Sequence, residues 1–211
     1  MIVRLPTTAS TMLEAARLAD EGAPHLSVVV ADEQTAGQGR HGRTWLSPKG
    51  GLYCTFVLRL LHPAPIVTLA LGLAVAEAVE VPCDLRWPND VMIGDRKLAG
   101  ILTALHGDAV LAGIGVNLED PGWPDAAWLA GVSRDGLLER LRSCVERYAA
   151  LAPADIIRLF THASTYAHGR RVEVEGIGLG VTAGLDERGF LLLQRDSGER
   201  VTVYAGGVRP A

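Results

Sequence analysis

The sequence predicts an α+β fold in which a sheet covered by helices is followed by a small all-β domain. Strand-like and helix-like stretches alternate early in the 211 residues. From about residue 170 only short strand-like runs follow, separated by Gly, Asp and Ser. Hydrophobic residues make up 48% of the chain, which is ample material for a core. Together these observations place the chain in the α+β class.

The N-terminal stretch should hold an edge strand at residues 2–5 and a buried strand at residues 27–31. Between them we expect a helix that starts near Ser10 or Thr11. Thr11 and Glu14 have the spacing of a capping box, and small apolar residues recur behind them at helical intervals. The sequence therefore predicts a strand–helix–strand start.

A polar, Gly-rich loop follows at residues 32–50, and a loop of this length inside a compact domain is often functional. The later predicted elements are a strand at 52–60, a buried helix at 66–80, a short strand at 84–87, a strand pair at 98–106 and 109–116, an amphipathic helix after residue 132 and a short helix from Pro153 to about Phe160. The texture changes at residues 165–169. We therefore expect one domain at residues 1–165 and a small β-barrel-like domain at residues 166–211.

Composition excludes several classes of function. The net charge of −4 argues against general nucleic-acid binding, which usually shows a basic footprint. The three cysteines lie far apart, so neither a disulfide framework nor a zinc site is expected. The N-terminus lacks the features of a signal peptide, and the longest apolar run, residues 69–76, is too short to span a bilayer. We expect a cytoplasmic protein with neither DNA nor a membrane as a partner.

The first segment with chemical character is GQGRHGR at residues 37–43. Its glycines match a dinucleotide fingerprint, but no helix opens after Gly42 and no acidic partner follows near residue 60. Glycines instead free the backbone for close approach to a ligand, and Arg40 and Arg43 add fixed positive charge. Such a loop suits a phosphate chain or a carboxylate. The alternative is a solvated loop with two surface arginines.

Two further segments place polar side chains beside strands. In RWPND, at residues 86–90, Asn89 and Asp90 could bind a metal–phosphate group or orient a lysine, or could simply form a turn after Pro88. In KLAGIL, at residues 97–102, Lys97 enters an otherwise apolar strand. A lysine at a strand end is often only a surface group with a buried stem.

The fourth segment is GIGVN, at residues 113–117. Two glycines leave space on one face of a strand, because they have no side chain, and so allow the close approach of a flat ligand. Asn117 could then read an adenine edge, or the strand could simply end there.

In this order and spacing, the four segments resemble the biotin–protein ligase family, whose Ser-Thr helix start is also present as Ser10-Thr11. The resemblance covers the whole chain. It implies a class II synthetase-like catalytic domain, with a mixed sheet flanked by helices, and a C-terminal SH3-like β-barrel. Because the pattern starts essentially at Met1, it implies the monofunctional type without an N-terminal DNA-binding domain.

The resemblance also implies the chemistry. ATP and biotin would form biotinoyl-5′-AMP, and a lysine of the biotin carrier domain of a carboxylase would then receive the biotin. The implied biotin-binding residues are Ser10, Thr11, Gln34, Gly37, Gln38, Gly39, Arg40, Lys97 and Gly100. The implied ATP-binding residues are Arg40, Arg43, Trp45, Asn89, Asp90, Lys97 and Asn117, with Lys97, Arg40 and Arg43 catalytic and Asn89 and Asp90 near Mg²⁺. The chain would act as a monomer or a homodimer.

Four positions depart from the family's usual pattern: Met12 stands for Asn, Gln38 for Arg, Ala104 for an acidic residue and Gly207 for Glu. They put ligand affinity and domain contacts in question more than the reaction class. Three other readings stay open. A lipoate–protein ligase or octanoyltransferase would share the fold but carries a different Gly-rich motif followed by His. A biotin-responsive repressor would need a helix-turn-helix. A binding protein that has lost activity would not need the arginines and Lys97.

Overall fold

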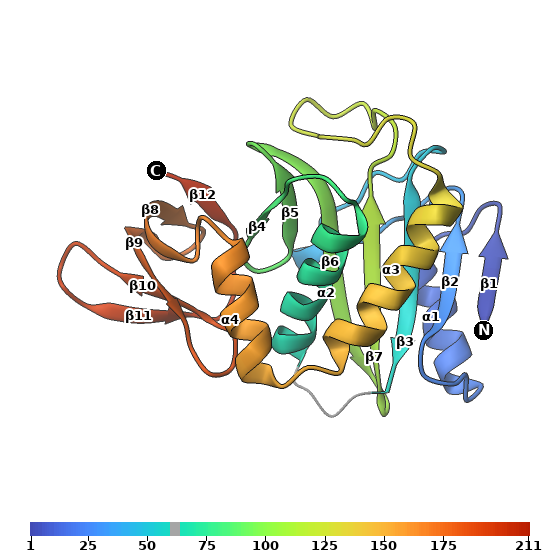
Figure 1. Ribbon diagram of the computed structural model, residues 1–211, viewed down its shortest axis with the longest axis horizontal. Helices are drawn as coiled ribbons and strands as arrows, with labels where there is room; N and C mark the ends of the chain where they lie inside the picture. The colour runs from blue at the N-terminus through green and yellow to red at the C-terminus, as the bar shows by residue number, and fades with distance from the viewer. Residues whose placement is uncertain (60–63) are drawn as a thin grey trace.

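The structure is a computed structural model that describes residues 1–59 and 64–211. Its main feature is a seven-stranded sheet in the order β1-β2-β3-β7-β6-β5-β4 (Figure 1). The strands are β1 (Ile2–Leu5), β2 (Ser27–Ala31), β3 (Leu52–Leu58), β4 (Asp84–Arg86), β5 (Asp90–Ile93), β6 (Arg96–His106) and β7 (Ala109–Val116). β1 pairs with β2 in parallel and the other neighbours are antiparallel, so the sheet is mixed, with β1 at one edge as expected.

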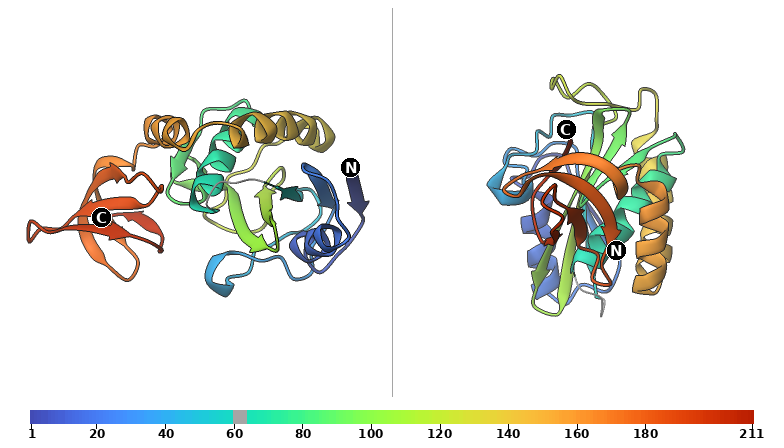
Figure 2. Two further views of the ribbon diagram at one scale, coloured as in Figure 1. Left: turned by 90° about the horizontal axis from the view of Figure 1, so that it is seen from below. Right: turned by 90° about the vertical axis from the view of Figure 1, so that its left-hand side faces the viewer.

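Helices cover both faces of this sheet. The helices are α1 (Thr11–Asp20), α2 (Ala64–Ala78), α3 (Arg134–Ala149) and α4 (Pro153–Ala163). Figure 2 shows α2, α3 and α4 on one face and α1 on the other. Because both faces are covered, every residue of β2, β3 and β7 is buried, which explains their continuous apolar runs. α1 packs on β2, β3 and β7.

The start of α1 differs in detail from the expected capping box. Ser10 is the N-cap, with an extended backbone, and its hydroxyl accepts a hydrogen bond from the Met12 backbone N–H at 3.3 Å. Thr11 is the first helical residue, so the capping box with Thr11 as the cap is wrong. The Glu14 carboxylate instead accepts a hydrogen bond from the Thr8 hydroxyl at 3.3 Å.

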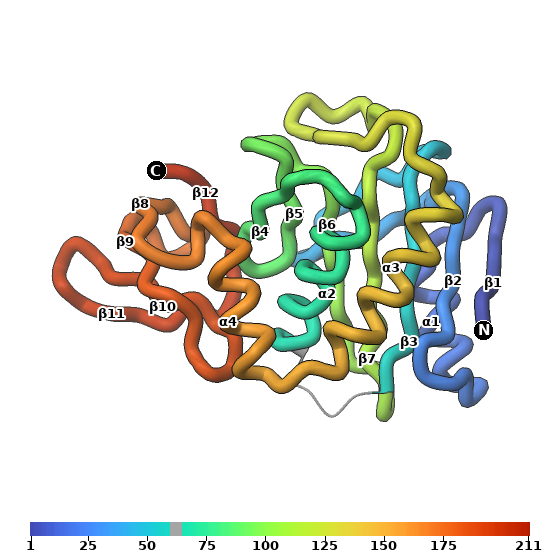
Figure 3. The backbone as a smooth tube through the Cα atoms, in the orientation of Figure 1, coloured from blue at the N-terminus to red at the C-terminus, as the bar shows by residue number. Residues whose placement is uncertain are grey.

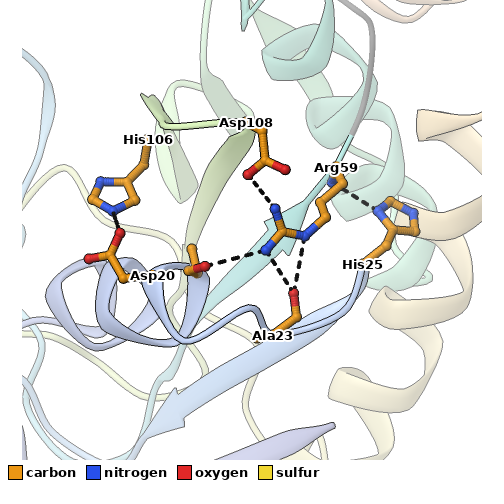
Figure 4. A network of polar contacts seen from close by, with 7 residues as sticks. Asp20, Ala23, His25, Arg59, His106 and Asp108 are labelled. Carbon is orange, nitrogen blue, oxygen red and sulfur yellow. Dashed lines mark hydrogen bonds and ion pairs between the residues drawn. The ribbon is translucent and has the colours of Figure 1, made fainter.

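The far end of α1 is tied to two other elements through Arg59. Its guanidinium donates to the backbone carbonyls of Ala19 and Ala23 and forms an ion pair with Asp108, in the turn between β6 and β7. Figure 4 shows this network, which also contains the contact of His106 Nε2 with Asp20 Oδ1 at 2.7 Å and the hydrogen bond from the Arg59 backbone N–H to His25 Nδ1. Fixing this end of the helix also fixes where its N-terminus lies.

One strand of the large sheet, β5, was not predicted. The RWPND segment is a tight hairpin: the chain leaves β4 at Arg86, turns over three residues and returns as β5, with Arg86 paired to Asp90. Pro88 indicated a turn in the sequence, and the strand that follows this turn was therefore not predicted. The helix expected at 66–80 is α2, shifted slightly toward the N-terminus, and the end of the strand expected at 52–60 lies outside the described residues.

The C-terminal strands form a separate five-stranded antiparallel sheet in the order β11-β10-β9-β8-β12, which confirms the small SH3-like β-domain (Figure 3). Its strands are β8 (His168–Val174), β9 (Gly178–Leu185), β10 (Leu191–Gln194), β11 (Arg200–Val203) and β12 (Val208–Pro210). The indole N–H of buried Trp87 donates to the Gly189 carbonyl at 3.0 Å and so joins the two parts. The division at residues 165 and 166 remains a prediction. Within the described residues, no helix is long and apolar enough to cross a membrane.

Candidate active site

A cavity of about 280 Å³ opens on the α1 side of the large sheet. Its walls come from the N-terminus of α1, the loop after β2, the β4–β5 hairpin, β6, β7 and the C-terminal domain. The sequence-predicted site residues that line it are Ser10, Thr11, Gln34, Gln38, Gly39, Arg40, Arg43, Trp45, Asn89, Asp90, Lys97 and Gly100. Residues up to 90 positions apart in the chain are thus brought to one site, whereas Gly37 and Asn117 do not line this cavity.

The end of the cavity next to α1 is built from neutral polar groups. Gln34 Oε1 accepts hydrogen bonds from the Thr11 backbone N–H at 2.8 Å and from the Thr11 hydroxyl at 3.0 Å. Gln34 Nε2 donates to the Ser47 hydroxyl at 2.8 Å. Ser10 and Thr11 are buried, with 1% and 3% of their surface exposed. These bonds hold the side chains of Thr11 and Gln34 in fixed positions, and the Met12 backbone N–H holds the Ser10 hydroxyl. We call Ser10, Thr11 and Gln34 the neutral end of the site.

The opposite end is built from three cations. Lys97 Nζ lies 2.6 Å from Asp90 Oδ1, and both side chains are about seven-tenths buried. Asp90 lies opposite Gly100 in the β5–β6 register, and the Lys97 side chain lies over Gly100, where a Cβ would be 3.4 Å from Lys97 Nζ. The Lys97 ammonium also lies 5.3 Å from the centre of the Trp45 ring, within cation–π range. We call Lys97, Arg40 and Arg43 the cationic end of the site.

Arg40 belongs to the short 3₁₀ turn at residues Arg40–Gly42. Its Nη1 donates to Asn89 Oδ1 at 3.1 Å and to the Gly206 carbonyl of the C-terminal domain at 3.3 Å. Burial lowers the pKa of Arg40; Asp90 opposes this shift and the neighbouring Arg43 adds to it. An anion that binds beside Arg40 would therefore stabilise this partly desolvated cation.

Arg43 extends to the C-terminal domain as well. Its Nη2 donates to both carboxylate oxygens of Glu175, at 2.7 and 2.8 Å, and Glu175 lies in the turn between β8 and β9. The hydrogen bond from Arg43 lowers the pKa of Glu175, and the charge of Arg43 adds to the effect. Sequence reasoning assigned no role to Glu175 or Gly206. Only the departure at Gly207 pointed to this part of the small domain.

The strand glycines have a different use from the expected one. A Cβ on Gly115 would lie 2.4 Å from Trp45 Nε1, and a Cβ on Gly100 would lie 2.9 Å from Trp45 Cζ3. The flat group that the glycines admit is therefore the indole of Trp45. A Cβ on Gly113 would lie 2.8 Å from Met12 Sδ, so this glycine makes room for Met12. The indole N–H of Trp45 is buried without a hydrogen-bond partner among the described residues.

The two predicted residues outside the cavity have structural contacts. The Asn117 side-chain amide donates to the carbonyls of Lys97, at 3.3 Å, and Ala127, at 3.1 Å, and so holds the following loop against β6. The Gly37 carbonyl accepts from the Trp45 backbone N–H at 2.9 Å, and a Cβ on Gly37 would lie 2.4 Å from the Trp45 carbonyl oxygen. Their predicted contacts with adenine and biotin remain predictions.

Asn89 and Asp90, the predicted magnesium neighbours, present oxygen atoms to the cationic end. The Asn89 side-chain amide makes two hydrogen bonds: its Oδ1 accepts from Arg40, and its Nδ2 donates to the Ile101 carbonyl at 3.0 Å. Asp90 supplies one carboxylate, which suits Mg²⁺ bound mainly through substrate phosphates. Among the described residues, no group of three or more His, Cys, Asp or Glu side chains could hold a metal ion by itself.

Comparison with known proteins identifies this arrangement. Residues 4–119 match the biotin/lipoate A/B protein ligase family, and residues 167–208 match the biotin protein ligase C terminal domain. The bifunctional ligase/repressor BirA of Bacillus subtilis is 32% identical over 90% of this chain and 68% of its own length. The biotin–[acetyl-CoA-carboxylase] ligase of Mycobacterium tuberculosis is 32% identical over 85% of this chain and 77% of its own.

A solved structure agrees with both matches. The biotin protein ligase of Aquifex aeolicus, in complex with biotin and ATP, superposes with a TM-score of 0.82 at 29% identity, over 100% of this chain and 99% of that one. The chain belongs to the biotin/lipoate A/B protein ligase family, and is therefore a ligase. Within that family, the match of its small domain places it among the biotin protein ligases. The resemblance expected from the four sequence segments is confirmed.

Proposed function

We propose that this ligase joins biotin to ATP, forming biotinoyl-5′-AMP, and transfers the biotin to a lysine of a carboxylase's biotin carrier domain in the cytoplasm. One observation carries the proposal: a single cavity holds a fixed set of neutral hydrogen-bonding groups at one end and three cations at the other. The relative from Aquifex is described in complex with biotin and ATP, and the mycobacterial relative is named for acetyl-CoA carboxylase. The three free thiols, Cys54, Cys83 and Cys144, suit a reducing compartment.

The neutral end suits the ureido ring of biotin. That ring offers one carbonyl acceptor and two N–H donors, and it carries no charge. Hydroxyl and amide side chains match both kinds of group, since each can donate and accept. Ser10 and Thr11, which are buried, and Gln34, which is partly buried, provide this combination at a place where hydrogen bonds discriminate strongly against ligands that leave them unpaired.

The cationic end suits the first reaction. A carboxylate oxygen of biotin attacks the α-phosphorus of ATP, the bond from that phosphorus to the bridging oxygen breaks, and pyrophosphate leaves. Two anions must meet, so their repulsion has to be neutralised. Arg40, Arg43 and Lys97 supply positive charge at this place, and positioning with electrostatic stabilisation suffices without a protein nucleophile.

Mg²⁺ would neutralise further phosphate charge when bound, held mainly by the phosphates with Asp90 as the neighbouring carboxylate. The backbone of Gln38 and Gly39 lines the same part of the cavity and can approach the ligand closely.

The second reaction transfers the acyl group. The acceptor lysine amine attacks the carbonyl of the mixed anhydride, AMP leaves, and the amine loses a proton to give the amide. The anhydride is also open to attack by water. The loop after β2 and the C-terminal domain both contribute to the cavity wall, and their contact through Arg43 and Glu175 narrows the access of water.

The experiment mixes the protein with Mg·ATP, biotin and a biotin carrier domain, and records the carrier's intact mass; lipoate replaces biotin in a parallel reaction. We expect the mass of one biotinoyl group to be added with biotin, and none with lipoate. A gain only with lipoate would assign the protein to the sister activity of the family. Biotin binding in calorimetry without any transfer would indicate a binding protein.

A further inference from the structure

Thr55 is a buried hydroxyl residue that does not line the cavity. It lies in the middle of β3, with 0% of its surface exposed, and its register partners are Val29 in β2 and Gly113 in β7. Val29 and Val57, on the same side of the sheet, belong to the small apolar cluster under α1. Valine would fill this place without a polar group, so the hydroxyl needs a hydrogen-bond partner to be tolerated.

The partner is Thr11, and the direction of the bond follows from a single backbone group. The Thr11 N–H can only donate, so the Gln34 atom 2.8 Å from it must be the amide oxygen. The Thr11 hydroxyl lies 3.0 Å from the same oxygen and must therefore give its only hydrogen to it. That leaves Thr55 as the donor in the 2.9 Å contact between the two threonine hydroxyls.

The series of hydrogen bonds continues beyond Gln34. Its Nε2 donates to the Ser47 hydroxyl, and Ser47 in turn donates to the Trp45 carbonyl at 3.1 Å. Every hydrogen in the series Thr55, Thr11, Gln34, Ser47 and Trp45 thus points the same way. Bonds arranged head to tail in this manner polarise and strengthen one another.

This order decides what the cavity offers to a ligand. The Thr11 hydroxyl donates its only hydrogen to Gln34 and accepts one from Thr55. Toward a ligand it can therefore act only as an acceptor. Gln34 keeps one amide hydrogen, because only one is used on Ser47. An acceptor beside a donor complements an N–H and a carbonyl of a cyclic urea.

We propose that Thr55 is a positioning residue, which fixes the Thr11 hydroxyl as an acceptor toward the ureido N–H of biotin. The inference rests on the proposed function. Without the Thr55 donor, one Thr11 lone pair is left buried and unpaired. The Thr11 hydrogen is then held by the Gln34 oxygen alone, and it can turn toward the ligand, where it meets the ureido N–H. The loss falls on binding of the ring and not on the chemistry at the cationic end.

The test compares Thr55→Val, which keeps the shape of the side chain, with Thr55→Ser, which keeps the hydroxyl. Thr103→Val is the matched control, since Thr103 and Thr68 form another hydroxyl pair, 2.7 Å apart, away from the neutral end. Biotin affinity is measured by calorimetry, KM and kcat by the carrier assay, and melting temperature by calorimetric scanning.

For Thr55→Val we expect Kd and KM for biotin to rise about tenfold, the effect of weakening one neutral hydrogen bond, with kcat and KM for ATP unchanged. Thr55→Ser should restore biotin binding, and Thr103→Val should leave it unchanged. Wild-type biotin affinity in Thr55→Val, or equal rises in KM for biotin and ATP, would overturn the proposal while leaving the ligase function intact. If the wild-type protein binds no biotin, the proposed function fails and Thr55 has no ligand to position.

Discussion

At the end of the cavity next to α1, neutral side chains bond to one another, whereas at the other end three cations pair with groups of the protein. Gln34 joins Thr11 to Ser47 through bonds of 2.8 to 3.0 Å. At the cationic end, Lys97 contacts Asp90 and Arg43 contacts Glu175.

The difference follows from the cost of burying each kind of group. A neutral hydroxyl or amide can bond to a neighbour and still keep capacity for a ligand. A cation that loses water must have a partner nearby, because an unpaired buried charge is strongly unfavourable. The side chains of the neutral end are therefore already held in position before biotin binds. At the cationic end, phosphates compete with protein carboxylates for the same cations.

The largest effect is expected at Lys97. Lys97→Ala removes a cation from the place where carboxylate and phosphate would meet in the proposed reaction, and it leaves Asp90 as an uncompensated anion there. We expect kcat/KM to fall about 10²- to 10³-fold, as for the loss of one transition-state donor, with biotin affinity changed far less. The exposed Lys49→Ala variant is the control and should keep full activity. Equal losses in the two variants would show that general charge, and not this position, matters.

The second-largest effect is expected at Gly115, which lies against the Trp45 indole. In Gly115→Ala the added Cβ would lie 2.4 Å from Trp45 Nε1, so the indole must move. We expect KM for ATP to rise about tenfold or more, because the ring beside Lys97 loses its place, and the tryptophan fluorescence to change. Gly72→Ala in α2 adds the same methyl where the nearest atom is 3.6 Å away, and should alter neither quantity. Unchanged KM for ATP in Gly115→Ala would separate Trp45 from nucleotide binding.

The smallest effect concerns Glu175, which holds Arg43 from the C-terminal domain. Glu175→Gln removes an exposed competitor for the phosphates, and we expect ATP to bind only a few-fold more tightly, because exposed ion pairs contribute little. The control is Asp196→Asn, which breaks the exposed pair with Arg171 within the same domain. Weaker ATP binding in Glu175→Gln would mean that Glu175 positions Arg43 and does not compete for it.

The pH dependence of this pair has a definite sign. Arg43 lowers the pKa of Glu175 in the folded protein. The pair therefore contributes fully above the ordinary pKa of a glutamate, and its contribution is lost as the pH falls through the lowered value. The difference in ATP affinity between wild type and Glu175→Gln should shrink over that acidic range, as followed by titrations in a pH series.

The sequence predicted twelve of the residues that line the cavity, because several of its polar residues follow or enter strands that meet in one sheet. Lys97 and Asp90 come together through the pairing of β5 with β6, although β5 itself was missed behind Pro88. The contacts of Arg40 and Arg43 with Gly206 and Glu175 were not predictable. They join residues more than 130 positions apart, and no periodicity marks the turn that carries Glu175.

The use of the glycines was also beyond sequence reasoning. Gly113 and Gly115 were predicted as places of close approach for a flat ligand, but only the packed structure shows that Met12 lies against Gly113 and Trp45 against Gly115. The direction of the hydrogen bonds from Thr55 to Trp45 likewise depends on distances between atoms of three segments: α1, β3 and the loop after β2.

The most direct test of the account is titration calorimetry with biotin alone and with ATP alone, each at low and high salt. The contrast between the two ends predicts that biotin binds the free protein without nucleotide. The Kd for biotin should change little with salt, because the ureido ring carries no charge. ATP binding should weaken about tenfold or more as salt screens the cationic end. Biotin that binds only after ATP, or ATP binding that is indifferent to salt, would contradict the account.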